Sequence, residues 1–192
     1  STSFTGAPDE NNCTVCHSSF ELNSGKGNFT FTGVPANYRP GQVYPITVTI
    51  NHPGAVVFGF QMVEMDNIGK TTGVWNLPAT TPAPLQIRNG IRNGNLRSYI
   101  EHTIDGITPT TFDTKSWTFS WTAPAKRAGK LRFYAAGNAG NDGDGPSGDY
   151  IYTTSGVTLS GSAISNFDSD TRSDLAVFRP TTGTWFRQSS QN

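Results

Sequence analysis

Short runs of alternating apolar and polar residues recur along most of the chain from residue 28 onward. Residues 43–50 alternate and are rich in β-branched side chains, and the aromatic residues Trp117, Phe119 and Trp121 fall on one face of their segment. Such alternation is typical of strands with one buried face. The pattern predicts strands over residues 29–34, 43–50, 56–65, 95–103, 116–121, 131–135 and 150–159.

Seven or eight short strands at intervals of about 10–20 residues predict an all-β chain that forms an immunoglobulin-like antiparallel β-sandwich. Helix is expected to be almost absent. Residues 67–94 contain three prolines and residues 137–145 are rich in glycine, so both segments are expected to be irregular. The predicted organisation is an N-terminal attachment segment with a loop or short helical turn (1–27), a sandwich (28–160) and a C-terminal hairpin extension or fragment (161–192).

Composition narrows the function further. Charged residues make up only 15% of the 192 residues, and 14 Lys and Arg balance 14 Asp and Glu. No strong field therefore attracts nucleic acid or an anionic membrane, and no apolar run approaches the roughly 20 residues that span a bilayer. The sequence begins at Ser1 without a charged and apolar leader, which we interpret as a mature product whose signal peptide has been removed.

The two cysteines both lie in one motif, Cys13-Thr14-Val15-Cys16-His17. Two thiols at this spacing can form thioethers to the two vinyl groups of one haem, and the adjacent imidazole can then bind the iron. The motif predicts a single covalent haem c, with Cys13 and Cys16 as attachment residues and His17 as the proximal iron ligand.

Three other interpretations of the motif remain open. A thioredoxin-like dithiol requires a βαβ setting that the pattern lacks. A structural zinc site requires further Cys or His ligands at close spacing. A simple disulfide between the two cysteines leaves His17 without a role.

The sixth iron ligand distinguishes an electron carrier from an open site that binds ligands or peroxide. The candidates within the chain are His52, His102, Met62 and Met65, and a neighbouring subunit could also supply one. His52 precedes a proline and is interpreted as a solvated turn residue, whereas Met62 alternates with phenylalanines as a core residue does. His102, at the end of a predicted strand, ranks first.

Several ordered motifs resemble bacterial reeler-like domains of the choice-of-anchor V type. They occupy residues 6–17, 29–35, 38–44, 58–61, 117–124 and 133–139, followed by Gly148 and Asp149. The resemblance covers roughly residues 5–160 and implies an exported cell-surface β-sandwich with a haem motif near its start. A Glu-His-Thr-like element also recurs in such domains, and it matches Glu101, His102 and Thr103, which favours His102 as the distal ligand.

Residues 166–180 and 183–186 are similar to one FG-GAP/VCBS-type propeller repeat. In those repeats an acidic loop supplies oxygen ligands to Ca²⁺, and Asp168, Asp170 and Asp174 fit its spacing. A solvated acidic turn is the alternative. A second acidic set, Asp142, Asp144 and Asp149, is interpreted as part of a flexible solvated loop, with Ca²⁺ binding as the alternative.

These observations predict an exported mono-haem cytochrome, extracellular or periplasmic and bacterial, that carries electrons to redox partner proteins or to neighbouring copies of itself. No set of residues indicates a hydrolytic enzyme, although an open sixth position would allow a sensor or peroxidase. The main alternative is a structural or adhesive surface protein, such as a filament subunit, in which haem is stabilising.

A single propeller repeat cannot bury both of its faces, so the tail is expected to pack against another molecule and to allow homo-polymers by strand addition. Deleting residues 164–192 should therefore reduce self-association in sedimentation experiments. Unchanged assembly of the shortened chain would exclude this role.

Overall fold

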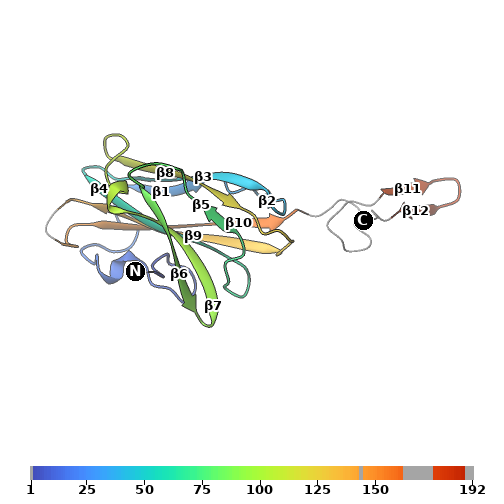
Figure 1. Cartoon of the computed structure of the whole chain (residues 1–192), viewed down its shortest axis with the longest axis horizontal. Helices are drawn as coiled ribbons and strands as arrows, with labels where there is room; N and C mark the ends of the chain where they lie inside the picture. The colour runs from blue at the N-terminus through green and yellow to red at the C-terminus, as the bar shows by residue number, and fades with distance from the viewer. Residues whose placement is uncertain (1, 143–144, 162–174, 189–192) are drawn as a thin grey trace.

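The computed structural model describes residues 2–142, 145–161 and 175–188. Ten strands in the first two of these ranges form two sheets that stack face to face (Figure 1). The four-stranded sheet has the order β1-β3-β8-β5 and the six-stranded sheet the order β2-β10-β9-β4-β7-β6. The ten strands of the two sheets are β1 (Asn28–Thr32), β2 (Asn37–Tyr38), β3 (Val43–Asn51), β4 (Val57–Met65), β5 (Val74–Asn76), β6 (Leu85–Arg92), β7 (Asn95–His102), β8 (Thr114–Thr122), β9 (Lys130–Gly140) and β10 (Tyr150–Ser160).

All strand pairings in the two sheets are antiparallel except the short parallel pair β2–β10. Helix is confined, within the described ranges, to two 3₁₀ turns, η1 (Cys13–Val15) and η2 (Ile104–Gly106). The predicted all-β sandwich is confirmed, as are all seven predicted strands.

The core between the sheets is made of large side chains that alternate inward from both layers. Trp121 is completely buried and packs edge-on against Phe133, with ring centroids 5.0 Å apart. Edge-to-face contact between aromatic rings adds stabilisation beyond the area that they bury. The other buried aromatic members of this core are Phe29, Tyr38, Phe58, Phe60, Trp75, Trp117, Phe119 and Tyr152.

Two segments that were expected to be irregular contain strands. β5 and β6 lie within residues 67–94, and β6 starts directly after the last proline of that segment. β6 is an edge strand that alternates apolar Leu85, Ile87 and Ile91 with polar residues. Asn89 and Gly90 interrupt this alternation, and the three prolines before it favoured a loop in the sequence. β9 continues through Gly137 to Gly140, because these glycines accommodate close neighbours: a Cβ at Gly137 would lie 2.9 Å from the Phe29 ring.

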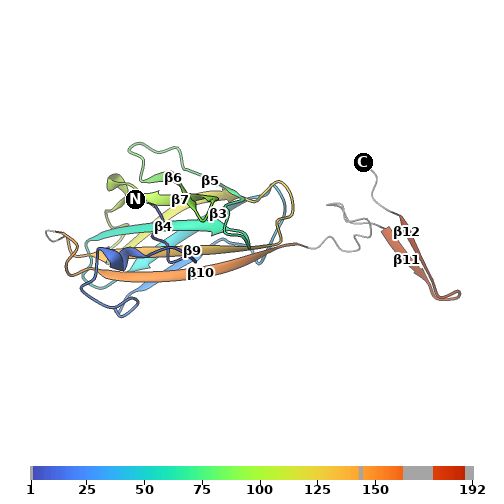
Figure 2. The same cartoon turned by 90° about the horizontal axis from the view of Figure 1, so that it is seen from below.

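A second, smaller apolar cluster lies on the outer face of the six-stranded sheet. It joins Ala7 of the N-terminal segment to Val63, Met65 and Tyr99 of the sheet. Figure 2 shows the blue N-terminal segment lying across β4, β9 and β10 on this face. The segment therefore forms a partial third layer over the sandwich.

The C-terminal hairpin is described by itself. β11 (Leu175–Arg179) pairs antiparallel with β12 (Thr184–Gln188), which agrees with the expected hairpin. The proposed calcium ligands Asp168, Asp170 and Asp174 lie outside the described residues. No helix in the described part of the chain is long and apolar enough to cross a membrane.

Replacement of the central core residue should be costly. Trp121→Ala is expected to lower the free energy of unfolding by about 3–5 kcal/mol, because it leaves a cavity that the two rigid sheets cannot fill. Phe112→Ala is the matched control, since Phe112 is 90% exposed and its removal should change stability by less than about 0.5 kcal/mol. Urea denaturation measures both. Equal losses would show that the two sheets do not depend on this core contact.

Candidate functional site

The cysteine motif forms a single tight turn. The side chain of Asn12 accepts a hydrogen bond from the Thr14 N–H at 2.9 Å and so caps η1. The backbone N–H groups of Cys16 and His17 both donate to the Cys13 carbonyl, at 3.2 and 2.9 Å. Residues three and four positions apart in a helical turn lie on one side of it. The turn thus presents both thiols and the imidazole in the same direction.

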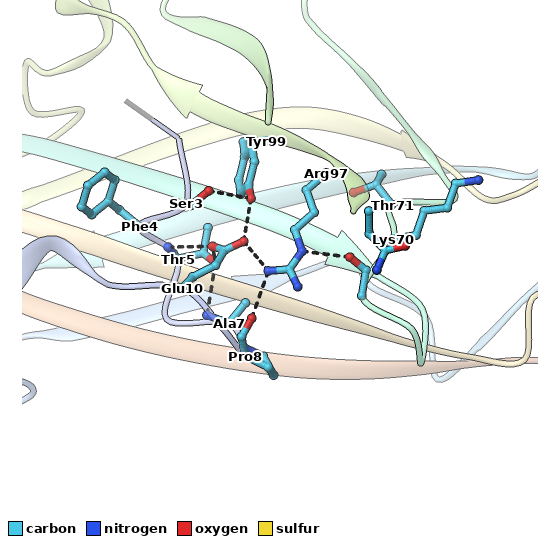
Figure 3. Close-up of polar contacts among 12 residues, drawn as sticks. Ser3, Phe4, Thr5, Ala7, Pro8, Glu10, Lys70, Thr71, Arg97 and Tyr99 are labelled. Carbon is cyan, nitrogen blue, oxygen red and sulfur yellow. Dashed lines mark hydrogen bonds and ion pairs between the residues drawn. The ribbon is translucent and has the colours of Figure 1, made fainter. Parts of the chain in front are cut away.

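A buried ion pair fastens the segment before this turn to β7. Glu10 Oε1 lies 2.7 Å from Arg97 Nη1, and both side chains are at most 2% exposed. The Tyr99 hydroxyl donates to the same carboxylate oxygen at 2.6 Å, and Arg97 also donates to the carbonyls of Gly69 and Pro8 (Figure 3). Because each charge is paired and hydrogen-bonded, the desolvation cost of burying it is offset.

His17 is oriented by a carboxylate from the other end of the chain. Its Nδ1 lies 2.7 Å from Asp149 Oδ2. Asp149 is only 5% exposed and also accepts from the Asn138 amide and, at 3.3 Å, from the Asn141 N–H. An ionised carboxylate can only accept, so Nδ1 carries the proton in this contact. The lone pair of His17 is then on Nε2.

His102 occupies the point where one strand ladder stops. The β4–β7 pairing extends only to Gln61 opposite Glu101. One residue beyond, the His102 side chain takes the place of a strand partner, with Nδ1 3.0 Å from both the N–H and the carbonyl oxygen of Phe60. The backbone therefore binds Nδ1 whichever tautomer is present. When Nδ1 donates to the Phe60 carbonyl, Nε2 has a free lone pair.

Gly59 explains how the imidazole of His102 fits against the sheet. A Cβ at this position would lie 2.5 Å from His102 Cε1, which is closer than real Cβ contacts come. The absence of a side chain at Gly59 thus creates the space that the ring occupies. At this point of the site β4 contributes only backbone atoms, against which the His102 ring lies.

All four residues of the predicted haem site line one cavity of about 480 Å³. This volume is within the usual range for sites that hold small molecules and cofactors. The cavity opens between the N-terminal turn and the outer face of β4, β7 and β9. Its lining residues are Phe4, Cys13, Cys16, His17, Gly59, Phe60, Gln61, Gln86, Arg88, Glu101, His102, Thr103, Ile104, Ile107 and Asn138.

One wall of the cavity is polar. Glu101 accepts hydrogen bonds from Gln61 at 2.6 Å and Gln86 at 3.0 Å, and it forms an ion pair with Arg88 at 2.8 Å. The Arg88 side chain is about half exposed, so its charge also reaches solvent at this wall. The rest of the lining includes the apolar residues Phe4, Phe60, Ile104 and Ile107. The cavity therefore has one polar and one apolar side, which suits an amphipathic ligand.

The other candidates for the sixth ligand lie elsewhere. Met62 is fully buried in the core between the sheets, as its alternation predicted, and Met65 belongs to the cluster under the N-terminal segment. The prediction that His52 is a solvated turn residue was wrong. His52 is 8% exposed, its Nδ1 lies 2.6 Å from the Tyr152 hydroxyl and its ring stacks on Tyr150. None of the three lines the cavity.

The thiols are free, and their environment bears on the competing interpretations of the motif. Burial raises the pKa of Cys13 to about 11. A redox dithiol requires the opposite shift, because the thiolate is the reactive form. Cys13 therefore lies in surroundings that suit a neutral sulfur.

A dedicated metal site built only from protein ligands is not found in the parts of the chain that the structure describes, where no three His, Cys, Asp or Glu side chains gather. Haem iron differs in this respect, because the porphyrin supplies four ligands and the protein only one or two. Two thiols, two histidines with available Nε2 atoms and the space at Gly59 fit such a group.

Asp149 is the residue that the sequence interpretation misplaced. It was grouped with Asp142 and Asp144 in a solvated loop, yet it is buried against His17, whereas Asp142 is exposed and Asp144 lies outside the described residues. Two signals were available: its position directly before the alternating segment of β10, and its place with Gly148 among the motifs of the family resemblance. Asn138 and Gly59, which complete the surroundings of the two histidines, also lie within those motifs, but nothing in the motifs assigned them to the site.

Comparison with known proteins gives similarity of fold only. No protein-family model and no curated protein matches the chain. Among solved structures, the Reelin-N domain of F-spondin is 15% identical, with 78% of this chain and 97% of that chain covered and a TM-score of 0.49. The human F-spondin reeler domain is 14% identical over 73% and 94% of the two chains, with a TM-score of 0.44.

A third similar structure is AvmM, which catalyses macrocyclization in alchivemycin A biosynthesis. It is 14% identical over 77% of this chain and 95% of that chain, with a TM-score of 0.49. The assignment as a β-sandwich depends on the strand pairing described above, and no function follows from these neighbours.

The burial of His52 predicts a pH dependence of stability. Burial lowers the pKa of His52 from its ordinary value, with Asp113 opposing the shift. A histidine with a lowered folded-state pKa stabilises the fold above its unfolded pKa of about 6.5, and this contribution is lost as the pH falls from there toward the folded-state pKa.

The stability advantage of the natural protein over His52→Gln should therefore shrink as the pH is lowered below about 6.5. Denaturant unfolding of both proteins across this range measures it, and His17 and His102 are common to the pair. A difference that is constant with pH would contradict the assignment of His52 as a buried neutral residue.

Proposed function

We propose that the chain is a c-type mono-haem electron carrier in which Cys13 and Cys16 would hold the haem through thioethers and His17 and His102 would be the two protein ligands of its iron. One observation carries the proposal. The motif residues Cys13, Cys16 and His17 line one cavity with His102, which lies at least 85 positions later in the sequence. The hydrogen bonds of both histidines engage Nδ1 and leave Nε2 for the iron. Orientation of a ligating imidazole through its second nitrogen is the usual arrangement in metal sites.

Haem iron with two such ligands takes up and releases one electron. The residues of this chain have three tasks in that process. The turn at 13–17 fixes the group to the fold, the backbone of Phe60 and the carboxylate of Asp149 hold the two imidazoles, and the apolar side chains of Phe4 and Ile107 line the cavity against water.

The polar wall suits the carboxylates of a porphyrin. Arg88 and Gln86 project from β6 into the cavity lining and can donate to anionic groups there. Glu101 already engages both residues, so a bound carboxylate would share their donors with it. The proposed location is outside the cytoplasm, with redox proteins or neighbouring copies of the chain as electron partners.

The intact mass of the protein, produced in cells that attach haem to exported proteins, is the first test. The natural protein should carry one haem, and Cys13→Ser with Cys16→Ser should carry none, because the chain has no other cysteine. A mass without haem for the natural protein would overturn the proposal.

Absorption and electron paramagnetic resonance spectra then test the axial pair. The natural protein should be low-spin, and His102→Ala should convert most of the iron to a high-spin form, because no other candidate ligand lines the cavity. His52→Gln is the matched control and should remain low-spin. A low-spin His102→Ala protein would exclude His102, and haem without a reversible redox couple would favour a stabilising role.

A further inference from the structure

Asp149 lies where two potential partners compete for one nitrogen of His17. The Asn138 amide nitrogen is 3.3 Å from His17 Nδ1, and Asp149 Oδ2 is 2.7 Å from the same atom. The Nδ2 group of the amide is a donor, whereas the carboxylate is an acceptor. The two groups therefore favour opposite tautomers of the imidazole.

The carboxylate also occupies the competing amide. Asn138 Nδ2 donates to Asp149 Oδ2 at 3.1 Å, so the same oxygen receives hydrogen bonds from both side chains. Without the carboxylate, the amide would become the nearest partner of Nδ1. In the orientation that the structure shows, with Nδ2 toward His17, it would donate to that nitrogen. The ring proton would then move to Nε2, and the nitrogen that faces the iron would no longer have a lone pair.

The position of Asp149 is itself well fixed. Gly148, just before it, has a backbone φ of 87°, which L-residues with side chains rarely adopt. The Gly148 N–H donates to the Ser19 hydroxyl at 2.8 Å, which ties this loop to the segment that follows the haem motif. The Asn141 N–H holds the second carboxylate oxygen. The carboxylate thus meets His17 in a defined orientation.

We propose that Asp149 is a positioning residue that holds His17 in the Nδ1–H tautomer and makes its Nε2 a stronger donor to ferric iron, which lowers the reduction potential of the site. This inference rests on the proposed function. A carboxylate that accepts from a ligating imidazole raises the basicity of that ligand. A buried negative charge close to the iron also favours the more positive ferric state. His102, in contrast, is held by a neutral backbone group.

The tautomer can be tested on protein without haem. Nitrogen-15 NMR of the Cys13→Ser, Cys16→Ser protein at about pH 8, above the ordinary histidine pKa of about 6.5, should show His17 protonated on Nδ1. Only three histidines are present, so their signals can be assigned by substitution. Asp149→Ala should shift His17 to the Nε2–H form, and Asn138→Ala added to Asp149→Ala should remove that preference. An unchanged His17 tautomer in Asp149→Ala would overturn the proposal.

The potential is tested on the haem-loaded protein with Asp149→Asn, which keeps the size of the side chain and removes its charge. The preference for ferric over ferrous iron should fall about 10-fold, in the range usual for loss of an outer-shell partner, which corresponds to a midpoint shift of about +59 mV for one electron. Glu101→Gln is the matched control, because it removes a carboxylate of the cavity wall that accepts hydrogen bonds from Gln61 and Gln86 rather than from His17.

The control should shift the potential less and leave the His17 tautomer unchanged. Equal shifts in the two variants would mean that charge alone acts, which would overturn the positioning role. A natural protein without haem would instead defeat the proposed function, while the NMR comparison would still decide whether Asp149 controls His17. The two failures are therefore distinguishable.

Discussion

Glu10 and Arg97 form an ion pair between side chains that are almost completely withdrawn from water, and they connect two parts of the chain that carry the candidate site. Glu10 lies three residues before Cys13, and Arg97 lies on the strand that ends at His102. Breaking such a pair by removing one partner is costly, because the remaining charge stays buried. The turn with the two thiols is therefore held against the strand that supplies the second histidine, and the spacing of the cavity follows from this contact.

The sandwich contributes to the site mainly through its irregularities. The regular ladder between β4 and β7 ends one residue before His102, and the imidazole uses the free backbone groups of Phe60. Gly59 removes a side chain from the adjacent strand position, and Gly148 turns the chain so that Asp149 approaches His17. A continuous sheet with side chains at every position would satisfy its own hydrogen bonds and leave no room for a prosthetic group. The candidate site thus depends on the point where the β4–β7 hydrogen-bond pairing ends and on glycines that leave room beside the sheet.

The sequence predicted the fold class well, because alternation in strands such as β3 and β8 reports directly on one buried face. It failed for β6, whose alternation is short, interrupted by Asn89-Gly90 and preceded by prolines, and for the end of β9, where Gly137 lies against the Phe29 ring. The motif at 13–17 identified one side of the candidate site through local spacing. The role of Asp149 depends on contact with a residue 132 positions away, and no local pattern encodes such a contact. His102 was ranked first because the chain has only three histidines and through a family resemblance, not through any signal of its proximity to His17.

The contacts that close the cavity join residues 87 positions apart between Glu10 and Arg97 and 132 positions apart between His17 and Asp149. Closing loops of this length costs conformational entropy, and the contacts between the intervening strands offset that cost. The cavity is therefore complete only when the strands that carry these residues have paired. The turn at 13–17 is closed by its own hydrogen bonds, but its place beside His102 depends on the contacts of Glu10 and Asp149. A group attached to its thiols would gain the second histidine only through the pairing of distant strands.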